Sequence, residues 1–131
     1  MEVLVPIDGS ECSFRALSFG VEFARRFDAS LHVVHITDSE TDATEDILER
    51  AREVLAEEDV DCEPELSTDV GLEFRPADRV GKDIVDLVEE RGYDHVVMGH
   101  HGSGSAIERA ILGSAAHTVV EEEAVPVTVV P

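Results

Sequence analysis

Apolar residues recur along this chain in two alternating patterns, short β-branched runs and longer stretches with helical spacing. The short runs are typical of buried strands, because Val and Ile pack well on a pleated surface. They predict strands at Glu2–Ile7, Ser30–Ile36, His95–Met98 and Val125–Val130. Apolar positions three and four residues apart predict helices at Ser10–Phe27, Thr44–Glu58, Ala77–Arg91 and Ile107–Glu122. A further strand is expected within residues 59–78, where Pro64 and Pro76 exclude a helix.

This alternation predicts the fold class α/β, a doubly wound, mainly parallel five-stranded sheet of Rossmann-like type with helices on both faces. A chain of 131 residues is long enough for one such domain, over residues 1–131. In these sheets a ligand binds beyond the carboxyl ends of the strands, where the strand order reverses. Asp8, Ile36 and Gly99 lie at three predicted carboxyl ends, so we expect them to meet at one edge.

The last predicted strand has an unusual feature at its start. Pro126 cannot donate a hydrogen bond to a neighbouring strand, so it marks an edge strand or a strand start. An exposed apolar edge promotes aggregation unless it is covered or paired. Self-pairing of Val127–Val130 across a two-fold axis would cover it.

Charge is the outlying property of the composition. Thirty acidic residues face ten basic ones, a net charge of −20, and Lys82 is the only lysine. Such a chain repels nucleic acids and anionic membranes, so both are excluded as partners. The acids are spread over every segment, which favours a halophilic organism's cytoplasm over a dedicated surface for a basic partner.

Targeting signals and metal motifs are not expected. The chain shows neither a charged-then-apolar leader nor an apolar run of about 18 residues, which predicts a cytoplasmic protein without a membrane span. Cys12 and Cys62 are expected to be thiols, and they lack the closely spaced Cys/His partners of a zinc site.

A glycine-rich stretch follows the strand at residues 95–98. Gly99, Gly102, Gly104 and Gly113 alternate with serines before helical spacing resumes. Glycines permit close backbone approach, and a helix start attracts anions, so this stretch is a candidate phosphate site. The alternative is a connecting loop without a ligand. The patterns of P-loop and dinucleotide-binding proteins are both missing.

Two motifs together resemble the universal stress protein family. The first is Pro6-x-Asp8-x-Ser10, and the second runs from Met98-Gly99-x-x-Gly102 to Gly113-Ser114. The resemblance covers nearly the whole chain. Ten residues separate Gly102 from Gly113, where the ATP-binding branch of the family has nine.

The resemblance implies an ATP-binding, homodimeric stress-response protein whose dimer forms through the last strand, with Mg²⁺ as a further component of the site. The positions that match the family's ATP contacts are Pro6, Ile7, Asp8, Ile36, Met98, Gly99, Gly102, Gly113, Ser114 and Ala115.

Each of these positions also has a structural interpretation. Asp8 suits a ribose hydroxyl or Mg²⁺, but aspartate is also a preferred helix cap. Ile36 and Met98 are equally consistent with simple core residues. His100 and His101 lie in the candidate phosphate loop, and they are either phosphate partners or a solvated pair.

No catalytic constellation stands out, so the expected function is a dimeric nucleotide-binding regulatory module. Two alternatives remain: a dimeric scaffold without a ligand, in which the extra loop residue has abolished binding, and a slow adenine-nucleotide hydrolase.

Overall fold

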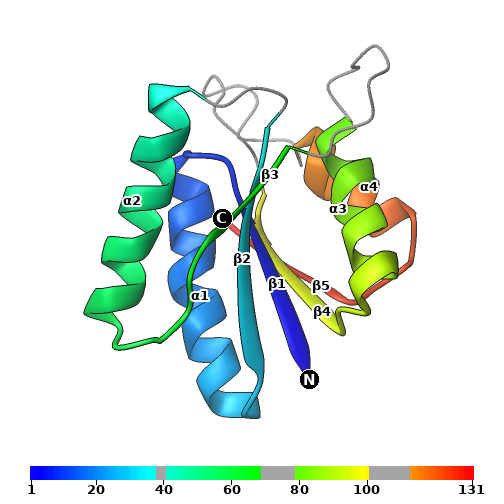
Figure 1. Cartoon of the computed structure of the whole chain (residues 1–131). Helices are drawn as coiled ribbons and strands as arrows, with labels where there is room; N and C mark the ends of the chain where they lie inside the picture. Colours follow the sequence, from blue (N-terminus) through cyan, green and yellow to red (C-terminus); the bar gives the residue numbers. More distant parts are fainter. Residues whose placement is uncertain (38–40, 69–78, 101–112) are drawn as a thin grey trace.

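The structure, a computed structural model, describes residues 1–37, 41–68, 79–100 and 113–131. Strands and helices alternate along these residues (Figure 1). The elements are β1 (Glu2–Ile7), α1 (Glu11–Phe27), β2 (Ser30–Ile36), α2 (Asp42–Glu57), β3 (Glu65–Ser67), α3 (Arg79–Arg91), β4 (His95–Gly99), α4 (Ser114–Glu121) and β5 (Val127–Val130).

The five strands form one parallel sheet in the order β3-β2-β1-β4-β5. The order reverses between β1 and β4, because the chain first adds strands on one side of β1 and then on the other. The predicted fold class is therefore confirmed, and β5 lies at an edge, which is one of the two interpretations that Pro126 left open.

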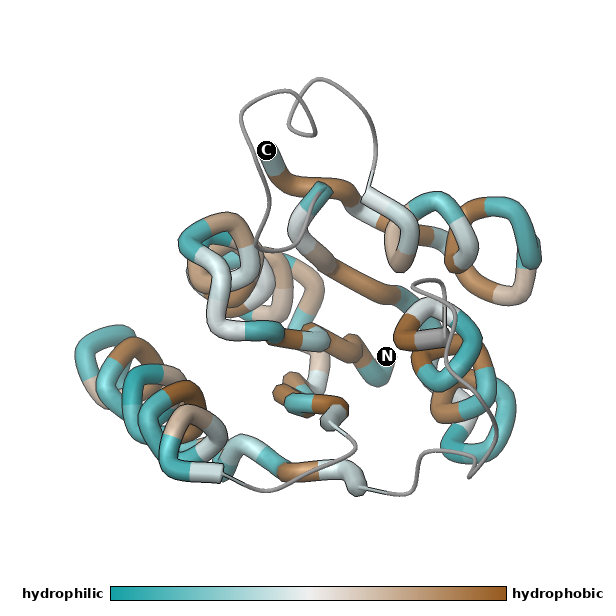
Figure 2. The backbone as a smooth tube through the Cα atoms, turned by 90° about the horizontal axis from the view of Figure 1, so that it is seen from above, coloured by the Kyte–Doolittle hydropathy of each residue, from teal (hydrophilic) through white to brown (hydrophobic). Residues whose placement is uncertain are grey.

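Two hydrophobic clusters fill the two faces of the sheet. Helices α1 and α2 cover one face, and α3 and α4 cover the other, with apolar residues turned toward the sheet (Figures 1 and 2). Neighbouring residues of β1 serve opposite faces: Leu4 belongs to the cluster under α3, while Val3 and Val5 pack under α1. This burial on both sides explains why β1 reads as a continuous apolar run.

Several element boundaries differ from the predicted ones. Helix α2 begins at Asp42 rather than Thr44, because the Thr44 hydroxyl accepts a hydrogen bond from the Thr41 amide at 3.1 Å and so closes its first turn. Strand β5 begins after Pro126, two residues later than predicted. The third strand, expected within residues 59–78, is only three residues long.

The last helix was predicted with the wrong start. Apolar spacing indicated a helix from Ile107, but α4 begins at Ser114 and Gly113 is its N-cap, with extended backbone angles of φ −61° and ψ 155°. An N-cap residue lies outside the helix, so Gly113 separates α4 from whatever precedes it. Residues 107–112 lie outside the described part of the chain.

Candidate functional site

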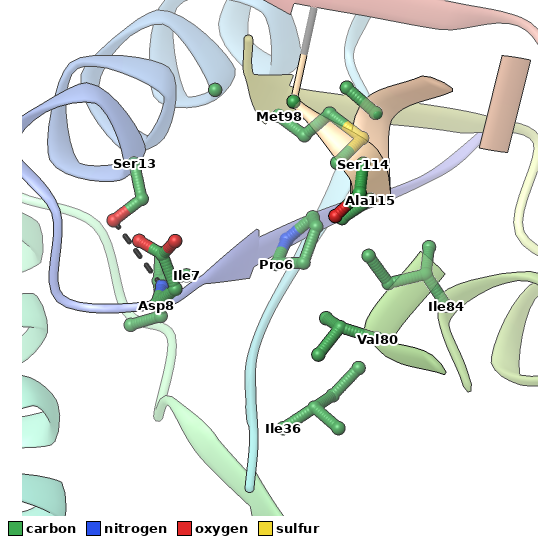
Figure 3. Close-up of a pocket in the computed structure, with 13 residues that line it drawn as sticks. Pro6, Ile7, Asp8, Ser13, Ile36, Val80, Ile84, Met98, Ser114 and Ala115 are labelled. Atoms are coloured by element: carbon green, nitrogen blue, oxygen red, sulfur yellow. Dashed lines mark hydrogen bonds between the residues drawn. The ribbon is translucent and has the colours of Figure 1, made fainter. Parts of the chain in front are cut away.

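A cavity of about 230 Å³ opens at the carboxyl edge of the sheet, at the point where strand order reverses. The ends of β1, β2 and β4 form its base, and the first turns of α1, α3 and α4 form its walls (Figure 3). The described lining residues are Pro6, Ile7, Asp8, Ser13, Ile36, Val80, Ile84, Met98, Gly99, Gly113, Ser114, Ala115 and Ala116.

The turn between β1 and α1 places the one charged side chain among these described lining residues, that of Asp8. Gly9 allows this turn because its φ is +87°, a left-handed conformation that glycine adopts without strain. Asp8 Oδ1 accepts hydrogen bonds from the Ser10 amide at 2.9 Å and from the Ser10 hydroxyl at 2.5 Å. The exposed carboxylate is thereby oriented at the rim of the cavity.

The helix cap itself is Ser10. Its hydroxyl oxygen accepts a hydrogen bond from the Ser13 amide at 3.1 Å, and the Ser13 hydroxyl in turn accepts one from the Asp8 amide at 3.3 Å (Figure 3). Asp8 therefore supports the cap through Ser10, and its carboxylate still borders the cavity. The interpretation of Asp8 as the helix cap is therefore wrong, because Ser10 is the N-cap of α1. The role of Asp8 toward a ribose hydroxyl or Mg²⁺ stays a prediction.

The opposite wall is the start of α4. Its N-cap, Gly113, contributes no side-chain hydrogen bond, and the Gly113 amide donates to the His100 carbonyl. By helix geometry the first-turn amides of Ala115 and Ala116 have no partner within the helix, and the positive end of the helix dipole lies with them. This wall favours an anionic group.

Close packing between α3 and α4 holds that wall in place. A Cβ atom on Gly81 would lie 2.6 Å from Thr118 Cβ and 2.9 Å from the Ala115 carbonyl oxygen. Only glycine lets the two helices approach to this distance. The position of the first turn of α4 thus depends on a glycine in the first turn of α3.

Gly99 also has a packing role. A Cβ atom there would lie 2.8 Å from Cys12 Sγ and 3.2 Å from the Cys12 carbonyl carbon. The sequence suggested that Gly99 lets a ligand approach the backbone. In the structure it borders the cavity and also admits the first turn of α1 against the end of β4.

The remaining wall is apolar. Ile36, Val80 and Ile84 line the side of the cavity across from Asp8 and Ser13, and Met98, at the end of β4, lies beside Ser114 and Ala115 (Figure 3). Ile84 and Met98 are nearly fully buried and also belong to the core under α3 and α4. The cavity therefore has an apolar side for a flat ring and a polar side for hydroxyl or anionic groups.

Nine of the ten residues proposed from the sequence line this cavity, and the tenth, Gly102, lies outside the described residues. Sequence reasoning missed Ser13, Val80, Ile84 and Ala116. Ala116 directly follows a proposed residue and could have been included. The other three depend on how α1 and α3 are rotated about their axes. Helical spacing assigned Val80 and Ile84 only to the core, and it gave Ser13 no role.

The histidine and cysteine predictions have separate outcomes. His100 points its Nδ1 toward Cys12 Sγ at 3.6 Å and is not among the described lining residues, while His101 lies outside the described part. Both cysteines are free thiols, and burial raises the pKa of the Cys62 thiol. Within the described ranges, no group of three or more His, Cys, Asp or Glu residues is placed to hold a metal ion.

None of the helices in the described part of the chain is both long and apolar enough to cross a bilayer.

Comparison with known proteins places these features in context. The family model described as the universal stress protein family matches residues 1–131. Universal stress protein MJ0531 of Methanocaldococcus jannaschii is 28% identical over 138 residues, covering 98% of this chain and 81% of that protein. Universal stress protein YxiE of Bacillus subtilis is 27% identical over 154 residues, covering 98% and 97%.

Solved structures share the fold over the full chain. A universal stress protein from Archaeoglobus fulgidus superposes with a TM-score of 0.77 at 26% identity, covering 100% of this chain and 98% of the other. A universal stress protein from the same organism, solved in complex with dAMP, gives a TM-score of 0.72 at 24% identity with the same coverage.

Proposed function

This chain belongs to the universal stress protein family, and we propose that it is a cytoplasmic stress-response protein that binds an adenine nucleotide, ATP above all, in the cavity at the carboxyl edge of its sheet. In this proposal the bound nucleotide regulates interactions of a dimer.

One observation carries the proposal: residues far apart in the sequence meet around one cavity. The end of β1 and the start of α4 are more than a hundred positions apart, yet Asp8 and Ser114 both line it. A cavity at the reversal of strand order is the expected ligand site in such a sheet.

The residues present fit an adenine nucleotide. Ile36, Val80 and Ile84 offer an apolar surface to a purine ring, and the Asp8 carboxylate can accept hydrogen bonds from ribose hydroxyls. The first-turn amides of α4 would hold phosphate oxygens. Mg²⁺, if bound with ATP, would have Asp8 as its one carboxylate ligand among the described lining residues.

The structure of the Archaeoglobus fulgidus protein in complex with dAMP makes adenine nucleotides the first class of ligand to test. That protein is 24% identical to this chain, so the likeness establishes the shared fold alone. The case for this chain therefore rests on its own cavity.

A binding role is favoured over catalysis. Among the described lining residues, Asp8 is the only side chain able to act as a general base, and it is held by two hydrogen bonds from Ser10. A hydrolase would position a second acid, base or cation near the phosphates. ATP turnover above the buffer background that disappears in Asp8→Ala would favour the hydrolase alternative.

The decisive experiment has two steps. The purified protein is denatured and the released small molecules are identified by mass spectrometry, and the nucleotide-free protein is then titrated with ATP and Mg²⁺ in molar KCl. Released adenine nucleotide or saturable binding supports the proposal. If the protein releases no nucleotide and shows no saturable binding, the alternative suggested by the ten-residue spacing is supported, a scaffold without a ligand.

A substitution at Gly113 tests whether ATP binds in this cavity. Gly113→Val should weaken ATP binding at least tenfold, because a branched side chain crowds the first turn of α4, where phosphates would lie. Gly113→Ala is the matched control and should lose much less. The φ of −61° suits any residue, so both variants should fold, which thermal melting can verify. Unchanged affinity in Gly113→Val would remove this turn from the site.

We also propose a homodimer through the edge strand. The register pairs Val96 with Val127, and the Val96 and His100 amides donate to the carbonyls of Pro126 and Val130. In a parallel ladder this alternation turns the backbone groups of Val127 and Val129 away from β4, toward the open edge. Antiparallel pairing with a second β5 would satisfy them, with the two-fold axis at Thr128.

A further inference from the structure

Helix α1 carries three phenylalanines at four-residue spacing, Phe19, Phe23 and Phe27, here called the phenylalanine stripe. Phe19 is 44% exposed and Phe27 58%, and they are two of the four large apolar side chains exposed among the described residues. The rings of Phe23 and Phe27 are in contact, with centroids 4.6 Å apart. Single exposed apolar residues are ordinary, but an aligned aromatic set marks an interaction surface.

The phenylalanine stripe runs alongside the edge strand. Phe23 stacks on His95 with centroids 4.6 Å apart, and His95 Nε2 lies 2.8 Å from the Thr128 hydroxyl oxygen. At the other end of β5, Arg15, one turn before Phe19, donates from Nε to the Pro131 carbonyl at 2.9 Å. Helix and strand therefore lie side by side and run in opposite directions.

The phenylalanine stripe is centred on the middle of β5. Phe23 lies level with Thr128, the middle of the open edge. Phe19 and Phe27 lie one helical turn to either side of it. A two-fold axis at Thr128, perpendicular to the sheet, would place a second α1 on the same face, antiparallel to the first.

Charge favours a second copy at this face. Helix α1 holds three arginines against two glutamates and β5 holds no charged residue, whereas the whole chain carries −20. Two such chains repel each other through most of their surface. The repulsion is smallest where α1 and β5 meet.

We propose that the phenylalanine stripe is the apolar core of a self-association surface, covered by the same stripe of a second copy. Phe23 lies opposite its own equivalent, and Phe19 opposite Phe27 of the second copy. The inference rests on the proposed pairing of β5, and adds to it a helix-to-helix contact that the backbone edge alone would not supply.

The test is sedimentation velocity of the full chain over a concentration series in molar KCl. The double variant Phe19→Ser/Phe27→Ser should raise the dimer dissociation constant about a hundredfold, roughly tenfold for each of the two symmetry-related contacts between Phe19 and Phe27. Val120→Ser is the matched control. Val120 is 48% exposed on α4, on the opposite face of the sheet, and its loss should leave dimerisation unchanged.

A second variant separates this inference from the pairing of β5. Val129→Pro removes an amide that faces the open edge and leaves the ladder to β4 intact, so it should abolish the dimer in a protein that still melts cooperatively. If Val129→Pro dissociates the dimer and the double variant does not, the phenylalanine stripe has no role in association. If the wild type is a monomer, or if the Val129→Pro variant is still a dimer, both the β5 dimer and the role of the phenylalanine stripe are overturned. ATP titration of the same sample measures nucleotide binding independently of the dimer.

Discussion

His95 begins β4 with its ring against Phe23 and its Nε2 beside the Thr128 hydroxyl. Burial lowers the pKa of this imidazole below its ordinary value near 6.5, because the charged form loses hydration. His95 thus contacts both helix α1, through Phe23, and strand β5, through Thr128.

This shift predicts a pH dependence of stability. Because the pKa is lower in the folded state, the unfolded chain binds more protons between the two values. The contribution of His95 is fully present above its unfolded pKa, and it is lost as the pH falls through the lower, folded pKa. Urea unfolding between pH 7.5 and about 5 should show a smaller loss for His95→Gln than for the wild type.

Identical pH profiles for His95→Gln and the wild type would show that the burial of His95 has no measurable consequence.

Among the described helices, α4 is the shortest. A helix of eight residues is too short to be stable in isolation. It is held by close packing on α3 at Gly81 and by the hydrogen bond from the Gly113 amide to the His100 carbonyl. The cavity wall that faces an anion is therefore set by contacts with other elements.

Gly81→Ala tests this dependence. Helix propensity alone would favour alanine by about 1 kcal/mol. The added Cβ, however, would lie 2.6 Å from Thr118 Cβ and 2.9 Å from a backbone oxygen, so the helices must separate. We expect a net destabilisation of about 1–3 kcal/mol in urea unfolding, together with weaker ATP binding.

Gly20→Ala provides the matched control. Its Cβ would lie 2.7 Å from Val5 Cγ2 in the core under α1, away from the residues that line the cavity. It should also destabilise the protein, but with unchanged nucleotide affinity. Equal affinity losses in both variants would mean that global stability, rather than the placement of α4, controls binding.

The whole molecule is dominated by its charge. Several arginines pair with glutamates at the surface, including Arg50 with Glu11 at 2.6 Å and Arg91 with Glu65 at 2.7 Å. These pairs lower the pKa of both glutamates. Ten basic residues cannot neutralise thirty acidic ones, so net self-repulsion remains.

Stability should therefore rise with salt. The Debye length falls from about 10 Å at 0.1 M to about 3 Å at 1 M, which screens repulsion between exposed carboxylates. We expect the melting temperature in molar KCl to exceed that in dilute buffer by several degrees, with most of the gain at the lower salt concentrations. A melting temperature independent of KCl would contradict adaptation to high salt.

Much of the architecture could be predicted because strands and helices differ in local pattern. The runs at Glu2–Ile7 and Ser30–Ile36 match β1 and β2 to the residue, since their β-branched side chains suit a sheet buried on both faces. The start of α4 could not be predicted in the same way. Apolar spacing continues through Gly113 without marking it as a cap.

The sequence by itself determined the alternation of elements and the parallel sheet, and it limited the last strand to an edge strand or a strand start at Pro126. These follow from residue periodicity, from the short connections between elements and from the missing amide of Pro126. It also indicated the strand ends at Asp8, Ile36 and Gly99, since parallel strands place their carboxyl ends at one edge.

Only the tertiary structure decided which helix residues reach the cavity and which glycines serve packing. Ser13, Val80 and Ile84 line the cavity because of how α1 and α3 are rotated against the sheet. Gly81 and Gly99 are required by the approach of elements far apart in the chain. Distances between such elements depend on the packing of both partners, and no local pattern along one segment contains that information.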